Sequence, residues 1–189
     1  MRLFTGIAIA PNVIDKLSAA LAELRPTARI NWSPVENLHI TSKFIGEWPE
    51  DRLPALTSAL AAVATAGPIP ITIARFGFFP NPHHPHSFFA GVQAGPGLGK
   101  LTAAIDQALA PLGLAPETRD FRPHITLARI KGTSDIRGLR EHIAGMTDFD
   151  FGSYEAANFH LYLSKPDSRG SVYTKLATYD LMRENNTTS

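Results

Sequence analysis

The chain has 189 residues, 44% of them hydrophobic, which suits one compact domain or two small lobes that share a core. Lysine and arginine number 18 against 17 aspartates and glutamates, for a formal net charge of +1. This near balance excludes the basic bias of a general nucleic-acid coat protein but allows a local basic cleft. With no cysteine, disulfides, thiolate metal sites and cysteine nucleophiles are excluded. Residues 1–17 lack a signal-peptide cleavage region and are too short to span a bilayer, so we expect a cytoplasmic, monomeric protein without a membrane partner.

Hydrophobic periodicity predicts short strands interleaved with amphipathic helices. Proline and glycine mark most of the boundaries, as where Pro11 opens a helix directly after the first strand. The predicted elements are a strand at 3–10, a helix at 11–24, a strand at 39–45, a helix from 50 or 51 to 63, strands at 69–76 and 87–93, a helix at 98–112, a strand at 124–130, a helix at 136–146, and strands at 157–163 and 172–181.

The same order of elements occurs twice, approximately at 1–80 and 86–165, followed by a final strand at 172–181. His39 and His124 are 85 residues apart, and so are Phe4 and Phe89 in the two leading strands. Two copies of so long a period indicate a duplication. We therefore predict an α+β fold: residues 1–189 form a single bilobal domain, with two antiparallel sheets facing a central cleft and helices on the outside.

Each repeat carries a His-x-Thr tripeptide on a predicted strand, at His39–Thr41 and at His124–Thr126. Residues i and i+2 of a strand point to the same side, so each histidine shares a face with its threonine. Near neutral pH, one imidazole can act as general acid and the other as general base in a phosphoryl displacement. Threonine hydroxyls can donate hydrogen bonds to phosphate oxygens. One tripeptide alone is weak evidence; two at matched places in a repeat predict one shared, metal-free phosphoesterase site.

Two cations near the tripeptides suit phosphate binding. By strand alternation Lys43 shares the face of His39, whereas Arg129 has the wrong parity to lie beside His124 unless its strand bends. For each, an ordinary solvated surface residue is an equally strong interpretation.

Two other features of the sequence are weaker evidence for a functional site. The loop with His83, His84 and His86 has no acidic or cysteine neighbour, so we interpret it as a surface cluster without metal, with contact to an RNA backbone left open. Phenylalanines at 76, 78, 79, 88 and 89 could stack on a base, but core packing is the stronger interpretation for most of them.

The segments NLHITSKFIG (37–46) and FRPHITLAR (121–129) resemble the two signature segments of the RNA 2′,3′-cyclic phosphodiesterase and 2′-5′ RNA ligase family, within the two-histidine phosphoesterase superfamily. The opening MRLFTGIAIAP and the segment at 172–177 are also similar. Three positions depart from the family pattern: Ser42, Phe89, and the His83–His86 loop that replaces a more Arg-rich stretch. The last two affect substrate preference rather than reaction type.

The resemblance implies metal-independent hydrolysis of RNA 2′,3′-cyclic phosphate ends to 2′-phosphomonoesters, with no cofactor. It assigns His39 as proton donor and His124 as proton acceptor, with Thr41 and Thr126 holding the phosphate. The partner would be RNA with a cyclic phosphate end, tRNA fragments included. A 2′-5′ RNA ligase, a phosphodiesterase for a small cyclic nucleotide, an RNA-end-binding module without turnover and a His-dependent metallohydrolase remain as alternatives.

Overall fold

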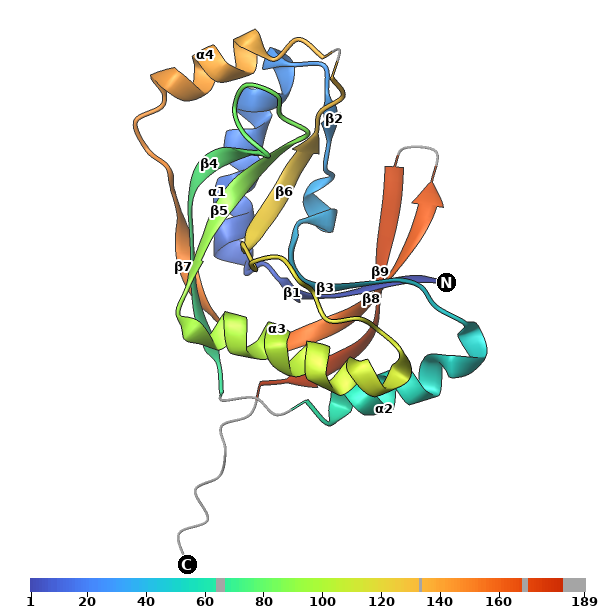
Figure 1. Ribbon diagram of the computed structural model, residues 1–189. Helices are drawn as coiled ribbons and strands as arrows, with labels where there is room; N and C mark the ends of the chain where they lie inside the picture. The colour runs from blue at the N-terminus through green and yellow to red at the C-terminus, as the bar shows by residue number, and fades with distance from the viewer. Residues whose placement is uncertain (64–66, 133, 168–169, 182–189) are drawn as a thin grey trace, which may run out of the picture.

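The computed structural model describes residues 1–63, 67–132, 134–167 and 170–181, and its strands form one antiparallel sheet (Figure 1). The strand order is β7-β4-β5-β6-β3-β1-β8-β9, and β2 pairs with β6 beside this path. The strands are β1 (Arg2–Ala8), β2 (Asn31–Trp32), β3 (His39–Glu47), β4 (Ile69–Phe79), β5 (Ser87–Ala94), β6 (His124–Arg129), β7 (Asp150–Ala156), β8 (Asn158–Asp167) and β9 (Gly170–Asp180).

The sheet consists of two halves that meet at β3 and β6. We call them the His39 half (β3, β1, β8 and β9) and the His124 half (β6, β5, β4 and β7). They are joined through one paired position, Ile40 opposite Ile125, both fully buried. The predicted α+β class with antiparallel strands is confirmed, and the two sheets expected from the sequence are the two halves of one curled sheet.

Each half takes strands from both sequence repeats. β4, from the first repeat, pairs with β5 and β7, while β8, from the second repeat, pairs with β1. The helices cross over in the same way: α1 (Pro11–Leu24) packs on β7, and α3 (Pro96–Leu109) packs on β3. This exchange ties the two halves into one structural unit.

The helices cover the outer face of the sheet and leave its inner face uncovered by helices (Figure 1). α2 (Leu53–Ala61) lies against α3 and β9, and α4 (Arg137–Gly145) lies near α1. Their apolar stripes bury leucines such as Leu17, Leu21 and Leu139 in one core shared with the strands. No helix in the part of the chain that the structure describes is long and apolar enough to cross a membrane.

Two features of the fold differ from the predicted elements. β2 and β7 were not predicted: β2 has only two residues, and the sequence of β7, DFGSYEA, alternates poorly between apolar and polar residues. The second and third predicted helices are α-helical over shorter spans, with short 3-10 turns at Glu50–Arg52 and Ala110–Leu112. Neither difference moves the strands that carry the His-x-Thr tripeptides.

Candidate active site

The two histidines begin adjacent strands and are held in the same way. Nδ1 of His39 donates to the carbonyl of Asn37 at 2.7 Å, and Nδ1 of His124 donates to the carbonyl of Arg122 at 2.8 Å. A carbonyl only accepts, so each ring carries its proton on Nδ1 and keeps Nε2 for chemistry. Nε2 of His39 lies 3.0 Å from Oγ1 of Thr41, so the predicted pairing of this histidine with its threonine is present in the structure.

Glycines on the neighbouring strands make room for this arrangement. A Cβ on Gly6 would lie 2.8 Å from the carbonyl oxygen of Ile40 and 3.4 Å from the ring of His39. A Cβ on Gly91, the equivalent residue of the second repeat and the partner of His124 in the ladder, would lie 2.6 Å from the carbonyl oxygen of Ala74. Both strands must therefore carry a residue without a side chain at these positions.

Among the described residues, three aromatic rings lie near His39, from Phe4, Tyr162 and Tyr173, whereas two lie near His124. His39 contacts Phe4, with ring centroids 4.7 Å apart, and Tyr173, edge-on at 5.3 Å. His124 contacts Phe79 at 4.9 Å and Phe89 at 5.5 Å. Burial lowers the pKa of His39, and the positive charge of His124 lowers that pKa further, against the opposing effect of the Asn37 carbonyl.

A β-bulge follows each His-x-Thr tripeptide and reverses the alternation of its strand. Along β1, Gly6 is opposite Thr41 but Thr5 is opposite Lys43, so Ser42 is an extra residue. Along β5, Phe89 is opposite Thr126 but Phe88 is opposite Ala128, so Leu127 is the extra residue. After each bulge, a residue expected on the inner face lies on the helix side, and the next residue lies on the inner face.

Hydrogen bonds from neighbouring segments hold both bulges in place. The hydroxyls of Thr5 and Ser42 share a buried hydrogen bond of 2.8 Å at the first bulge. At the second, Ser33 donates its backbone N–H to the carbonyl of Leu127 at 2.8 Å and its hydroxyl to the carbonyl of Thr126 at 2.9 Å. The bulges are therefore fixed parts of the fold.

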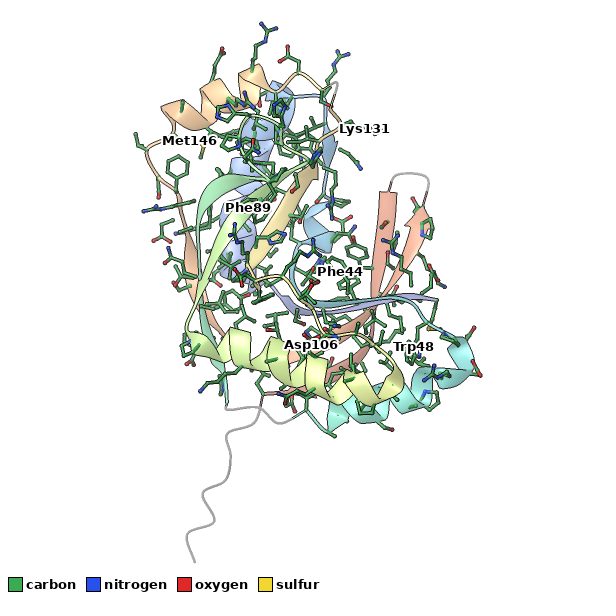
Figure 2. All side chains as sticks on the ribbon, viewed as in Figure 1. Phe44, Trp48, Phe89, Asp106, Lys131 and Met146 are labelled. Carbon is green, nitrogen blue, oxygen red and sulfur yellow. The ribbon has the colours of Figure 1, made fainter. Side chains whose placement is uncertain are left out.

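The bulges correct the prediction for Lys43. This lysine is on the helix side, only 9% exposed, where it forms an ion pair with Asp106 of α3 and donates to the carbonyl of Ala115 at 2.7 Å. Phe44 takes the inner face instead and is 68% exposed. Figure 2 shows Phe44 on the side of β3 away from α3, and Asp106 on α3 itself.

The second bulge is the strand irregularity that Arg129 needs in order to lie on the same face as His124. Leu127 and Ala128 are consecutive and both fully buried, so Arg129 is exposed on the same side as His124 and Thr126. The residue five positions after the histidine is thus Phe44 in the His39 half and Arg129 in the His124 half. The structure places His39, Thr41, His124, Thr126 and Arg129 on the same face of the sheet, and Lys43 on the opposite face.

Comparison with known proteins identifies the family. The model of the 2′-5′ RNA ligase superfamily matches residues 13–162, which is most of the chain. This chain belongs to the 2′-5′ RNA ligase superfamily. The resemblance seen in the sequence is confirmed.

Two curated relatives and two solved structures illustrate how far the likeness to this superfamily extends. The chain is 32% identical to an RNA 2′,3′-cyclic phosphodiesterase of Methanocaldococcus jannaschii, over 92% of this chain and 96% of that protein. It is also 34% identical to an RNA 2′,3′-cyclic phosphodiesterase of Aeropyrum pernix, over 75% of this chain and 80% of that protein. A solved Thermus thermophilus structure aligns with TM-score 0.79 and 26% identity, over 97% of this chain and 100% of that one. The structure of Escherichia coli LigT with 3′-AMP aligns with TM-score 0.77 and 24% identity, over 96% of this chain and 98% of that one. This likeness shows that the two proteins share a fold.

The sequence did not identify Phe44 and Tyr162 as residues near the site, and it favoured a packed role for Tyr173 over a place at the border of the cleft. Alternation along β3 places Phe44 on the outer face, and only the bulge brings it inward. Tyr162 stacks on Phe4 with ring centroids 4.9 Å apart, and burial raises its pKa to about 12. Strand pairing brings these tyrosines of β8 and β9 beside β1, which is far away in sequence.

The loop with His83, His84 and His86 stands apart from the described contacts of the two histidines. The side chain of Asn81 accepts hydrogen bonds from the backbone N–H groups of His83 and His84, so it shapes the loop as a turn. No group of three or more metal-ligand side chains occurs among the residues that the structure describes.

Proposed function

We propose that this protein is an RNA 2′,3′-cyclic phosphodiesterase that hydrolyses cyclic phosphate ends of RNA to 2′-phosphomonoesters without a metal. The observation that carries the proposal is the matched pair of imidazoles on adjacent strands, each fixed through Nδ1 and free to exchange a proton at Nε2. Its relatives from Methanocaldococcus jannaschii and Aeropyrum pernix bear this activity in their names.

In the proposed reaction, a water attacks phosphorus opposite O3′, and the bond between phosphorus and O3′ breaks. His124 takes the proton of the attacking water, and His39 gives its Nε2 proton to O3′, so the product carries a 2′-phosphate and a 3′-hydroxyl. Burial favours the neutral form of His39 in the free protein. An anionic phosphate beside His39 opposes that effect, because a nearby opposite charge favours the protonated form of the imidazole.

The remaining groups of the site bind the substrate. Thr41 and Thr126 donate hydroxyl hydrogen bonds to the non-bridging oxygens, and Arg129 supplies a planar pair of donors for the same charge. The exposed ring of Phe44 offers a surface on which the terminal base stacks. The residue five positions after the histidine therefore has a different role in each half: Phe44 stacks on the base, and Arg129 binds the phosphate.

The direct test is an RNA oligonucleotide with a 2′,3′-cyclic phosphate end, incubated with the protein with and without EDTA. We expect turnover to 2′-phosphate that survives EDTA and falls by about 10²- to 10⁴-fold in His39→Ala and in His124→Ala. Loss of turnover on chelation would support the metallohydrolase alternative, and tight binding without product would support the RNA-end-binding module.

A substrate with sulfur in place of O3′ assigns the two roles. A thiolate leaves without protonation, so His39→Ala should recover most of its lost rate on this substrate, whereas His124→Ala should not. Recovery by His124→Ala alone would reverse the assignment of acid and base. Adding RNA with a 5′-hydroxyl to the same reaction tests the family's other named activity, since a 2′-5′ ligase would join the two pieces.

The proposal includes the setting of the reaction. The substrate class is RNA with cyclic phosphate ends, tRNA fragments included, and the protein acts as a cytoplasmic monomer. The two halves share one sheet within a single chain, which supplies both histidines without a second copy. Light scattering that shows an active dimer would contradict the monomer.

A further inference from the structure

A pocket of about 460 Å³ opens beside His39, on the side of the ring formed by the end of β1, the turn Val35–Asn37 and strands β8 and β9. Its polar lining comprises Glu36, Asn37, Tyr162, Tyr173 and Lys175, along with His39 itself. The volume is within the range of pockets that hold small ligands. The proposed reaction leaves this space unused, although it shares His39 with the site.

Two side chains give the pocket its chemistry. Lys175 and Glu36 both line it and both are exposed, and neither takes part in an ion pair among the described residues. A lysine ammonium suits a phosphate, and a carboxylate accepts a hydrogen bond from a hydroxyl. A ligand with a phosphate next to a hydroxyl would satisfy both groups at once. A ribonucleotide within an RNA chain has this pair of groups.

The direction of the RNA chain leads to the same place. O3′ is bonded to C3′, and C3′ is bonded to C4′, which carries C5′ and the 5′ phosphodiester. The atom that receives the proton of His39 is therefore on the side of the ribose from which the rest of the RNA departs. A pocket beside His39 is therefore within reach of the preceding nucleotide.

We propose that this pocket binds the nucleotide on the 5′ side of the cyclic phosphate, with Lys175 on its phosphodiester and Glu36 on its ribose 2′-hydroxyl. The inference rests on the proposed function with His39 as the proton donor. Tyr173, whose ring is nearly perpendicular to that of His39, forms the wall shared by the pocket and the reaction centre. The 2′-hydroxyl contact would let the enzyme distinguish RNA from DNA one nucleotide away from the reacting phosphate.

The experiment compares kcat/KM for four substrates: adenosine 2′,3′-cyclic phosphate, the same compound with a 5′-phosphate, the dinucleotide ending in cyclic phosphate, and that dinucleotide with 2′-deoxyribose in its first nucleotide. Lys175→Met should lower kcat/KM about tenfold on the 5′-phosphorylated and dinucleotide substrates and leave the unphosphorylated mononucleotide unchanged. Glu36→Gln should abolish a roughly fivefold preference for ribose over deoxyribose in the first nucleotide.

Lys165→Met is the matched control, because Lys165 is an exposed lysine of β8 that does not line the pocket. This variant should leave all four values unchanged. If Lys175→Met slowed every substrate equally, or if the wild-type protein ignored the 5′-phosphate, the pocket would not be a nucleotide subsite.

Binding of the reaction products separates this inference from the proposed function. Wild-type protein that hydrolyses none of the four substrates would overturn the function itself. In that case, calorimetry with adenosine 2′-phosphate and adenosine 2′,5′-bisphosphate still tests the pocket. Tighter binding of the bisphosphate that Lys175→Met removes supports the pocket, and equal affinities overturn it.

Discussion

Lys43 should contribute to stability and not to catalysis, because it is on the helix side of β3. Lys43→Met removes the positive partner of Asp106, whose side chain is only 18% exposed, and also the hydrogen bond to Ala115. Breaking a buried ion pair destabilises a protein by roughly 3–5 kcal/mol, and the residual exposure of Asp106 favours the lower end, about 3 kcal/mol. For a chain of this size that corresponds to a fall in Tm of about 6–12 °C.

The assay measures Tm by calorimetry and kcat/KM on a cyclic phosphate substrate well below the Tm of the variant. Arg129→Met is the comparison: it should keep its Tm and lose kcat/KM by about 10- to 100-fold, as expected for a lost charged hydrogen bond. Lys43→Met combined with Asp106→Leu should recover much of the lost stability, because no unpaired charge is left buried. A Lys43→Met variant with unchanged Tm and a kcat/KM as low as that of Arg129→Met would refute this reasoning.

Four further results are expected. His160 is 5% exposed, and its burial, together with the positive charge of Lys175, lowers its pKa to about 4. The unfolded chain therefore binds a proton that the folded protein does not, so the free energy of unfolding should fall by about 2 kcal/mol between pH 7 and pH 5 in urea titrations. His160→Asn should make the free energy of unfolding less dependent on pH in this range. The dependence of kcat/KM on pH should be bell-shaped with limbs that belong to the coupled pair of histidines, so a steady rise to pH 9 would contradict acid–base catalysis. Gly91→Ala should lower the unfolding free energy by about 2 kcal/mol because its Cβ would lie 2.6 Å from a backbone oxygen, whereas Gly99→Ala, with nothing within 4 Å, should not. Phe44→Ala should raise KM about tenfold for a base-bearing substrate and leave an abasic cyclic phosphate unaffected, since stacking is lost but little buried area.

Apolar spacing was sufficient to predict most helices and strands, because local periodicity reports which face of an element is buried. The separation of 85 residues between His39 and His124 was likewise readable, and the structure places equivalent carbonyls, at Asn37 and Arg122, behind both rings. The exchange of β4 and β8 between the halves was not readable. Pairing partners of strands are set by long-range packing, and no residue pattern within either repeat records them.

The bulges explain why strand alternation was wrong for Lys43 and why the place of Arg129 depended on a bend in its strand. An extra residue in a strand reverses the faces of the side chains that directly follow it. Nothing in the sequence marks Ser42 or Leu127 as such a residue, since neither is a glycine or proline. The hydrogen bonds that hold the bulges come from Thr5 and Ser33, both distant in sequence. Simple alternation therefore predicted the correct side for the histidines and threonines, which precede the bulges, and the wrong side for Lys43, which follows one.

A duplicated fold provides two nearly equivalent histidines, but the proposed reaction needs one acid and one base. Any difference between them must come from surroundings that the repeats do not share. His39 packs against Phe4 and Tyr173, and burial lowers its pKa. Beyond the bulges, the inner face presents an aromatic ring, Phe44, in the His39 half and a cation, Arg129, in the His124 half. A substrate that places its base on Phe44 and its charge near Arg129 can enter in one orientation only, and that orientation determines which imidazole meets the leaving oxygen.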